Sequence, residues 1–259
     1  MAKAALVTGA AKRIGRALAL CLAGRGYDVA VHFAGSREEA EGLVREIGSL
    51  GQQGVALAAN LLDDKETEEL VPRATRALGP LAVLVNNASI FEHDTLSSAT
   101  HESWARHMGS NLKAPFFLTQ AFAAQAPEAE TDENGEPLAT GLVINVIDQR
   151  VRKLTPEFMT YTLAKSALWT LTRTSAQALA PRIRVNAIGP GPTLRGPRQS
   201  EEHFRLQRTG TILERGSDPE GVARAMEYFL DSHAVTGQLL CVDGGQHLAW
   251  KTPDIQGAE

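Results

Sequence analysis

The stretch that decides the fold is Ala4-Ala5-Leu6-Val7-Thr8-Gly9-Ala10-Ala11-Lys12-Arg13-Ile14-Gly15. A short apolar run, typical of a buried strand, enters a turn that contains glycine, and a helix-length stretch follows it. Glycines in such a turn let the backbone approach a pyrophosphate, and the helix N-terminus behind it offers free N–H groups and a positive dipole end. The stretch therefore predicts the first strand, turn and helix of a dinucleotide-binding unit.

The rest of the chain repeats the same alternation. Apolar runs of strand length recur at 29–33, 55–58, 81–85, 142–146, 183–187 and 239–242. Helix-length stretches lie between most of them, at 14–24, 37–50, 65–78, 158–180 and 219–230. This alternation predicts an α/β fold with a parallel sheet of about seven strands and helices on both faces. Since no repeat or change of composition divides the chain, we expect one doubly wound, Rossmann-type domain over 1–259.

Two segments interrupt the alternation. Residues 126–141 are acidic and rich in turn formers, which predicts an exposed, irregular connection before the fifth strand. Residues 189–216 hold prolines, glycines and basic side chains without clear periodicity. Long irregular stretches in compact domains are usually functional or disordered, so we expect a substrate lid there.

Composition excludes several classes of protein. Hydrophobic residues make up 43% and charged residues 22% of the 259 residues, as in ordinary globular domains. The net charge of −4 gives no basic surplus for nucleic acid or an anionic membrane. No apolar run reaches the roughly 18 residues of a membrane span, and the first run meets Gly9 too early for a signal peptide. We expect a cytoplasmic protein that acts on a small molecule.

Cysteine and histidine spacing suggests no metal site. Cys21 and Cys241 lie far apart in sequence, as expected for free thiols in a reducing compartment. His93, His101 and His107 show no ligand spacing with cysteine or carboxylate. We therefore predict no metal.

Basic residues around the first turn indicate an anion. Lys12, Arg13 and Arg16 crowd the start of a helix, where cations oppose the helix dipole by about 0.3–1 kcal/mol each. A solvated basic turn is the alternative. The second strand leaves through His32 to Ser36 without the carboxylate that an NAD site places against the ribose hydroxyls. This favours NADPH, with Arg13 and Ser36 as donors to a 2′-phosphate; His32 contacts the cofactor or is a packed strand residue.

A candidate proton-transfer pair stands on the longest predicted helix. Tyr161 and Lys165 are four residues apart, so their side chains share one helix face. An adjacent ammonium is expected to lower the pKa of the tyrosine toward neutral pH. Polar residues follow the fourth and fifth strands at 86–89 and 145–148, and ligands of such sheets bind beyond the carboxyl ends of the strands.

This layout resembles the short-chain dehydrogenase/reductase family over nearly the whole chain. The resemblance implies that Asn60-Leu61 contact the adenine and that Asn111 sustains a proton-relay water. It also implies that Pro190-Gly191 with Thr193 clamp the nicotinamide amide, and that Val242 to Gly245 form the turn after the last strand. The residues expected to bind the cofactor are Gly9, Lys12, Arg13, Ile14, Gly15, His32, Ser36, Asn60, Leu61, Asn87, Ala88, Ser89, Tyr161, Lys165, Pro190, Gly191 and Thr193.

Three departures from the common family pattern are similar to the pteridine reductase branch, including its dihydromonapterin reductases. Arg13 replaces the middle glycine of the turn, Ser89 replaces the glycine after Asn-Asn-Ala, and Asp148 replaces the catalytic serine. Phe91 also matches a phenylalanine of that branch. The basic residues that the branch places around the 2′-phosphate are thinned here to Ala34-Gly35.

The resemblance implies an NADPH-dependent reductase of a pterin such as dihydropterin, dihydrofolate or dihydromonapterin. Its expected catalytic residues are Asp148, Tyr161, Lys165 and Asn111, and its expected substrate contacts are Arg13, Ser89, Phe91, Asp148 and Tyr161. An ionised Asp148 would repel a developing oxyanion, whereas a ring C=N acceptor can use a carboxylic acid and a phenol as proton donors. A flat pterin could lie between Phe91 and the nicotinamide.

Two alternatives stay open at this point. One is a reductase of ketones or 3-oxoacyl thioesters in the same family. The other is a non-catalytic NADP-binding regulatory protein. In each case we expect a homo-oligomer, either a dimer or a tetramer.

Overall fold

A computed structural model describes residues 3–196 and 199–251. The ends of the predicted domain 1–259, and positions 197 and 198 of the predicted lid, lie outside these ranges. Within the described residues, no helix is both long and apolar enough to span a bilayer.

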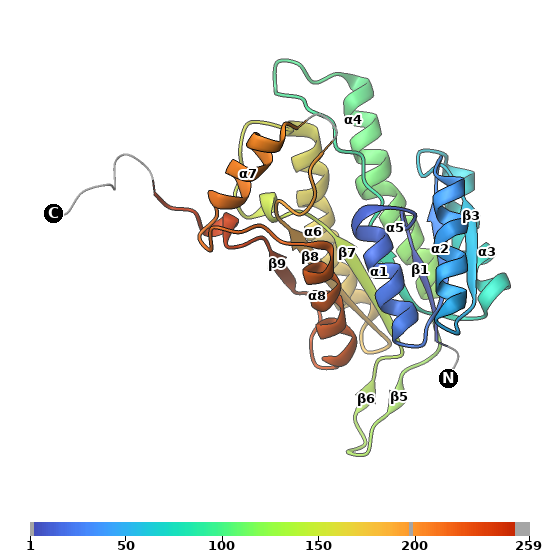
Figure 1. The fold of residues 1–259 in the computed structure, drawn as a ribbon. Helices are drawn as coiled ribbons and strands as arrows, with labels where there is room; N and C mark the ends of the chain where they lie inside the picture. Colours follow the sequence, from blue (N-terminus) through green and yellow to red (C-terminus); the bar gives the residue numbers. More distant parts are fainter. Residues whose placement is uncertain (1–2, 197–198, 252–259) are drawn as a thin grey trace.

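The centre of the molecule is a parallel sheet (Figure 1). Its order is β3-β2-β1-β4-β7-β8-β9, seven strands in all, as predicted. The strands are β1 (Ala4–Val7), β2 (Asp28–Phe33), β3 (Gly54–Ala58), β4 (Leu81–Asn86), β7 (Gly141–Val146), β8 (Ile183–Pro190) and β9 (Leu239–Val242). Apolar runs form them because both faces of a parallel sheet are covered, so most side chains of the central strands are buried.

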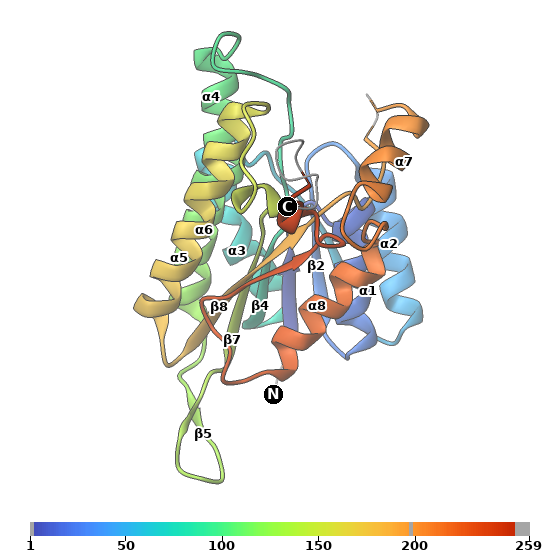
Figure 2. The same ribbon diagram turned by 90° about the vertical axis from the view of Figure 1, so that its left-hand side faces the viewer.

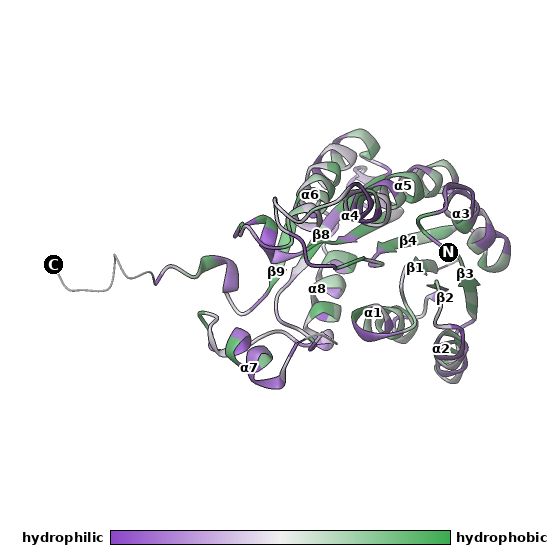
Figure 3. Cartoon of the chain, turned by 90° about the horizontal axis from the view of Figure 1, so that it is seen from above, coloured by the Kyte–Doolittle hydropathy of each residue, from purple (hydrophilic) through white to green (hydrophobic). Residues whose placement is uncertain are grey.

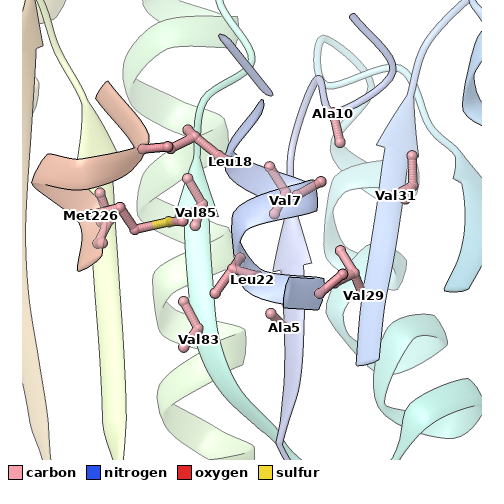
Figure 4. Packing of buried hydrophobic residues seen from close by; sticks show 14 of the residues in the cluster. Ala5, Val7, Ala10, Leu18, Leu22, Val29, Val31, Val83, Val85 and Met226 are labelled. Atoms are coloured by element: carbon pink, nitrogen blue, oxygen red, sulfur yellow. The ribbon is translucent and has the colours of Figure 1, made fainter. Parts of the chain in front are cut away.

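Helices cover the two faces, as the side view in Figure 2 shows. One face carries α1 (Arg13–Gly24), α2 (Arg37–Ser49) and α8 (Pro219–Asp231); the other carries α3 (Asp64–Leu78), α5 (Ala114–Gln125) and α6 (Met159–Leu179). Leu18 and Leu22 of α1 pack between Val7, Val85 and Met226 in the core of the first face (Figure 4). The predicted doubly wound α/β fold is confirmed.

Several short elements lie above the sheet or beside it. They are α4 (His101–Met108), a π-helical turn (Gly109–Lys113), α7 (Glu201–Thr209) and the 3₁₀ turns Gln149–Val151 and Gln246–Leu248. The acidic connection 126–141 is exposed, as expected, but it is not irregular throughout. Its strands β5 (Glu130–Thr131) and β6 (Pro137–Leu138) form a hairpin at the amino edge of the sheet (Figure 1). The predicted lid likewise contains the end of β8 and the helix α7.

The strand order reverses between β1 and β4, and this point fixes where a ligand binds. Successive strands run outward from β1 to β3 on one side and from β4 to β9 on the other. The loops after β1 and β4 therefore diverge and leave a crevice at the carboxyl edge, the usual ligand site of such sheets. The view from above in Figure 3 looks onto this edge, with α1 and α2 on one side and α4, α5 and α6 on the other.

Candidate active site

The glycine turn is tied to the end of β4 at the switch point. Gly9 has φ +60°, a conformation that glycine adopts without strain. A Cβ on Gly15 would stand 2.2 Å from the Gly9 carbonyl oxygen, so α1 can approach the turn only with glycine there. The Asn87 side chain donates to the carbonyls of Thr8 (2.9 Å) and Gly9 (3.1 Å), while the Thr8 hydroxyl accepts from the Ala88 N–H (3.0 Å).

His32 lies beneath this turn. Its Nδ1 accepts from the Gly9 N–H at 3.0 Å, so Nε2 carries the proton and donates to the Ala59 carbonyl at 3.0 Å. The side chain is only 2% exposed, and burial lowers its pKa to about 4, which keeps the ring neutral. The structure therefore gives His32 the packed position that the sequence left as the alternative to a cofactor contact. We infer that it holds the turn in shape.

The three cations of the first turn have different partners. Lys12 pairs with Glu39 at 2.5 Å, and Arg16 pairs with Glu46. These exposed ion pairs explain Lys12 and Arg16 without an anion. The Arg13 guanidinium instead donates to the carbonyls of Leu194 and Arg195 in the predicted lid, at 3.0 Å each.

The start of α1 nevertheless fits an anion. Lys12, the N-cap residue of α1, makes no side-chain capping bond, so no capping side chain covers the first N–H groups of the helix. Arg13 holds the positive φ of 57°, which its family position usually gives to glycine, and Ile14 packs on the core behind it. The turn can therefore present backbone N–H groups to a pyrophosphate.

The predicted ribose and adenine contacts border the same crevice. Ser36 precedes α2 and makes no side-chain capping bond there. Asn60 follows β3, where its side-chain oxygen accepts from the Leu62 N–H at 3.1 Å and shapes the turn. Leu61 is half-buried against the core on the α3 side.

The predicted catalytic side chains meet where β7 ends and α6 begins. The Tyr161 hydroxyl donates to Asp148 Oδ2 at 3.0 Å, and Asp148 Oδ1 accepts from the Arg150 N–H at 2.8 Å. Lys165 Nζ donates to the Val146 carbonyl at 2.8 Å and lies 5.7 Å from the centre of the Tyr161 ring. Tyr161 is 5% and Lys165 2% exposed. The Ser89 hydroxyl donates to the Ile90 carbonyl at 3.3 Å.

Phe91 lies beside the tyrosine but is stacked on another ring. Its ring is parallel to that of Phe158, with centroids 4.3 Å apart, and meets Tyr161 edgewise at 4.7 Å. Arg150 covers the Phe158 ring at 5.1 Å. Phe158 therefore occupies one face of the Phe91 ring.

Asn111 and the lid base complete the set of predicted residues. Asn111 lies in the π-helical turn, where its amide accepts from the Ile90 N–H (2.9 Å) and donates to the Ile90 carbonyl (2.8 Å). After Pro190 ends β8, a Cβ on Gly191 would stand 2.6 Å from the Asp243 Cβ. The Thr193 hydroxyl donates to the Gly191 carbonyl at 3.0 Å.

Comparison with known proteins identifies the family. The model of the short chain dehydrogenase family matches residues 3–204. The chain belongs to the short-chain dehydrogenase family. It is 32% identical to 3-oxoacyl-(acyl-carrier-protein) reductase FabG of Staphylococcus aureus, over 96% of this chain and 99% of the relative.

Two solved structures resemble this short-chain dehydrogenase more strongly. FolM alternative dihydrofolate reductase 1 from Brucella suis, in complex with NADP, is 44% identical with a TM-score of 0.91, covering 98% of this chain and 100% of the other. Its counterpart from Brucella canis, also complexed with NADP, is 43% identical with a TM-score of 0.89, covering 98% of both chains. The sequence resemblance to this family is thus confirmed.

The pKa of Tyr161 in this short-chain dehydrogenase differs from the expectation. Burial, together with the charge and hydrogen bond of Asp148, raises the pKa of Tyr161 well above its ordinary value. The expectation that the pKa of Tyr161 lies near neutral pH is wrong, because burial and the neighbouring Asp148 carboxyl both favour the neutral phenol. Burial also raises the pKa of Asp148 and lowers that of Lys165 to about 8.

Sequence reasoning missed Phe158 and Arg150. Phe158 lies three residues before Tyr161, a spacing that could have indicated a shared side of the helix start. Its left-handed backbone, with φ 57°, had no signal in the sequence. Among the described residues, no three His, Cys, Asp or Glu side chains gather as a metal site would require.

Proposed function

We propose that this short-chain dehydrogenase uses NADPH to reduce a ring C=N bond of a pterin-type substrate. The observation that carries the proposal is the contact between the buried Asp148 carboxyl and the Tyr161 hydroxyl, at 3.0 Å. In the protein without substrate the phenol donates and the carboxyl accepts. Burial favours proton uptake by Asp148, after which either group can donate the one proton that a ring nitrogen takes up with the hydride.

The crevice fits the cofactor at three places. The uncapped start of α1 suits the pyrophosphate, and Gly191 admits a close backbone approach beside the site. Ser36, which makes no side-chain capping bond at the start of α2, suits the 2′-phosphate. NADPH, when bound, supplies the hydride.

The protein's own side chains then donate the proton and orient the cofactor and the substrate. Tyr161, held as a neutral phenol by its raised pKa, is the proton donor closest to the reacting atoms. Lys165, anchored on the Val146 carbonyl, points its charge toward the ring of Tyr161 and the expected position of the nicotinamide ribose. The exposed side of Phe91 offers an apolar wall on which a flat ring can stack, worth about 0.5–1.5 kcal/mol beyond burial.

Similarity supports this reading, since the two FolM structures named above are described as alternative dihydrofolate reductases with NADP. It also supports the alternative. The FabG relative is named as a 3-oxoacyl thioester reductase, and a ketone or thioester substrate would need Asp148 to stay protonated beside the oxyanion. A non-catalytic NADP-binding protein would have no use for the buried Asp148, Tyr161 and Lys165 arrangement.

A substrate panel separates these functions. Purified protein is mixed with NADPH and, in separate assays, a dihydropterin, dihydrofolate, a diketone and acetoacetyl thioester. We expect NADPH oxidation with the two pteridines. Turnover of the diketone or the thioester alone would support the alternative, and cofactor binding without any turnover would support the regulatory protein.

The role of Arg13 yields a separate prediction. Arg13→Ala should weaken NADPH binding about 10–100-fold and NADH binding far less, because a charge-assisted bond to phosphate is lost. Titration of both cofactors by fluorescence measures this. Arg16→Ala is the matched control, since Arg16 pairs with Glu46 on the surface. Equal weakening of both cofactors would place Arg13 at the pyrophosphate or at the lid carbonyls that it already contacts.

We also propose, on the resemblance alone, that the chain forms a dimer or tetramer in the cytoplasm. Light scattering on the purified protein measures the mass of the assembly against the 27.8 kDa of one chain.

A further inference from the structure

A buried polar cluster lies directly behind the catalytic tyrosine. Its centre is Asp94, on the loop between β4 and α4, whose side chain is only 3% exposed. Asp94 accepts three hydrogen bonds: from the Thr160 N–H (3.1 Å), the Thr160 hydroxyl (2.5 Å) and the Ser103 hydroxyl (3.0 Å). Burial would raise the pKa of Asp94, but the bonds from Thr160 and Ser103 outweigh it and lower the pKa. The carboxylate is therefore ionised.

His107 of α4 extends the cluster into a chain with one direction. The ring is fully buried, and its Nε2 accepts from the Glu92 N–H at 3.2 Å. A backbone N–H can only donate, so the ring proton is on Nδ1, which lies 2.7 Å from the Thr160 hydroxyl. The ring donates to Thr160, and Thr160 donates to Asp94.

This row of hydrogen bonds ends at the start of α6, the helix that carries Tyr161. Phe158, the N-cap residue of α6, makes no side-chain capping bond. Asp94 takes that role from another element: its carbonyl accepts from the Met159 N–H (3.2 Å) and its carboxylate from the Thr160 N–H. A carboxylate on the first N–H groups is favoured by the helix dipole. Tyr161 is the next residue, and its ring also meets the His107 ring edgewise at 6.0 Å.

We propose that Asp94, Thr160 and His107 are positioning residues that fix where α6 begins and so hold the Tyr161 hydroxyl in place for proton transfer. The same loop carries Phe91, whose ring meets the Tyr161 ring edgewise. These hydrogen bonds therefore fix the position of the start of α6 relative to the loop between β4 and α4. The inference rests on the proposed function only in assigning proton transfer to Tyr161, which the thioester alternative shares.

Thr160→Val tests the proposal, because it keeps the shape of the side chain and removes the shared hydroxyl. A displacement of about 1 Å in a reacting group costs up to about 100-fold in rate. We expect kcat to fall about 10–100-fold on whichever panel substrate the wild type reduces, with KM for NADPH unchanged. The solvent deuterium isotope effect on kcat should rise as proton transfer becomes slower. Thr160→Ser, which restores the hydroxyl, should recover both.

A second readout needs no substrate. The chain has three tyrosines, so ¹³C-tyrosine NMR resolves Tyr161, assigned from the spectrum of Tyr161→Phe. Thr160→Val should shift this signal. Ser103→Ala is the matched control, because it also removes one bond to Asp94 but leaves the start of α6 untouched. If Thr160→Val does not fold, Asp94→Asn is measured instead. The amide group of Asn has one oxygen, so it can accept only one of the two bonds that Thr160 donates to separate carboxylate oxygens of Asp94.

The proposal is overturned if the chosen variant keeps the wild-type kcat, isotope effect and Tyr161 signal. It is equally overturned if Ser103→Ala shifts the Tyr161 signal as much, because the cluster would then serve stability alone. Failure of the pterin assignment does not affect either readout, since the kinetics use the substrate that the wild type accepts and the spectra use none.

Discussion

Replacing Tyr161 by phenylalanine is expected to reduce turnover by about 10²-fold or more, while NADPH still binds. A general acid typically contributes about 10²–10⁴-fold, and the phenol of Tyr161 is the hydroxyl that donates to Asp148 in the site. The raised pKa of Tyr161 keeps it protonated at neutral pH. Steady-state NADPH oxidation gives the turnover, and a fluorescence titration gives cofactor affinity.

Tyr228→Phe serves as the control for this substitution. Tyr228 lies half-exposed on α8, on the other side of the sheet from α6, so the same chemical change there should leave turnover unaltered. Near-full activity of Tyr161→Phe would show that another group donates the proton, and the assigned mechanism would then be wrong.

The second large effect is expected at Asp148. Asp148→Ser should abolish dihydropterin reduction, because a serine hydroxyl is too weak an acid to replace the carboxylic acid in supplying the one proton that the ring nitrogen takes up. The same variant should gain weak activity on simple diketones, since the carboxylate that repels an oxyanion is gone. Parallel assays of the variant and the wild type on both substrate classes measure the change. Unimpaired pterin reduction by Asp148→Ser would make Asp148 a turn residue at the strand end, held by its bond to the Arg150 N–H.

The pH profile gives a further check on Asp148. Burial raises its pKa, so the protonated fraction falls as pH rises through that raised value, and wild-type turnover of a pterin should fall in the same direction. Asp148→Asn, which cannot titrate, should flatten this part of the profile. Lys165, with a pKa of about 8, is expected to add a loss of turnover only at higher pH. A profile that is unchanged in Asp148→Asn would assign the titration to another group.

The sheet could be predicted from the sequence because every strand is a short apolar run between turn signals. The helices α5 and α7 could not be predicted in the same way. The stretch that forms α5 is apolar on nearly all sides, since it packs between the sheet, α3 and α6, and so it lacks the periodicity of a half-exposed helix. In contrast, α7 buries none of its residues, so no apolar stripe marked it.

The candidate site was predictable where strand ends decide it. Asn87 and Asp148 follow β4 and β7 at the same edge because the strands are parallel, and Tyr161 at the start of α6 meets Asp148 there. The direction of the Tyr161 pKa was not predictable, since it depends on the distances to Asp148 and Lys165 and on burial. The contacts of Arg13 with the lid and of Asp94 with α6 join residues far apart in sequence, which a local pattern does not reveal.

The most direct test of the central claim is the ratio of kcat/KM for a dihydropterin to kcat/KM for acetoacetyl thioester, measured with NADPH on the wild-type protein. The buried Asp148 beside Tyr161 favours protonation of a ring nitrogen over stabilisation of an oxyanion. We predict a ratio well above one, which falls below one in Asp148→Ser. A wild-type protein that reduces the thioester and is inert toward every pterin would contradict the account.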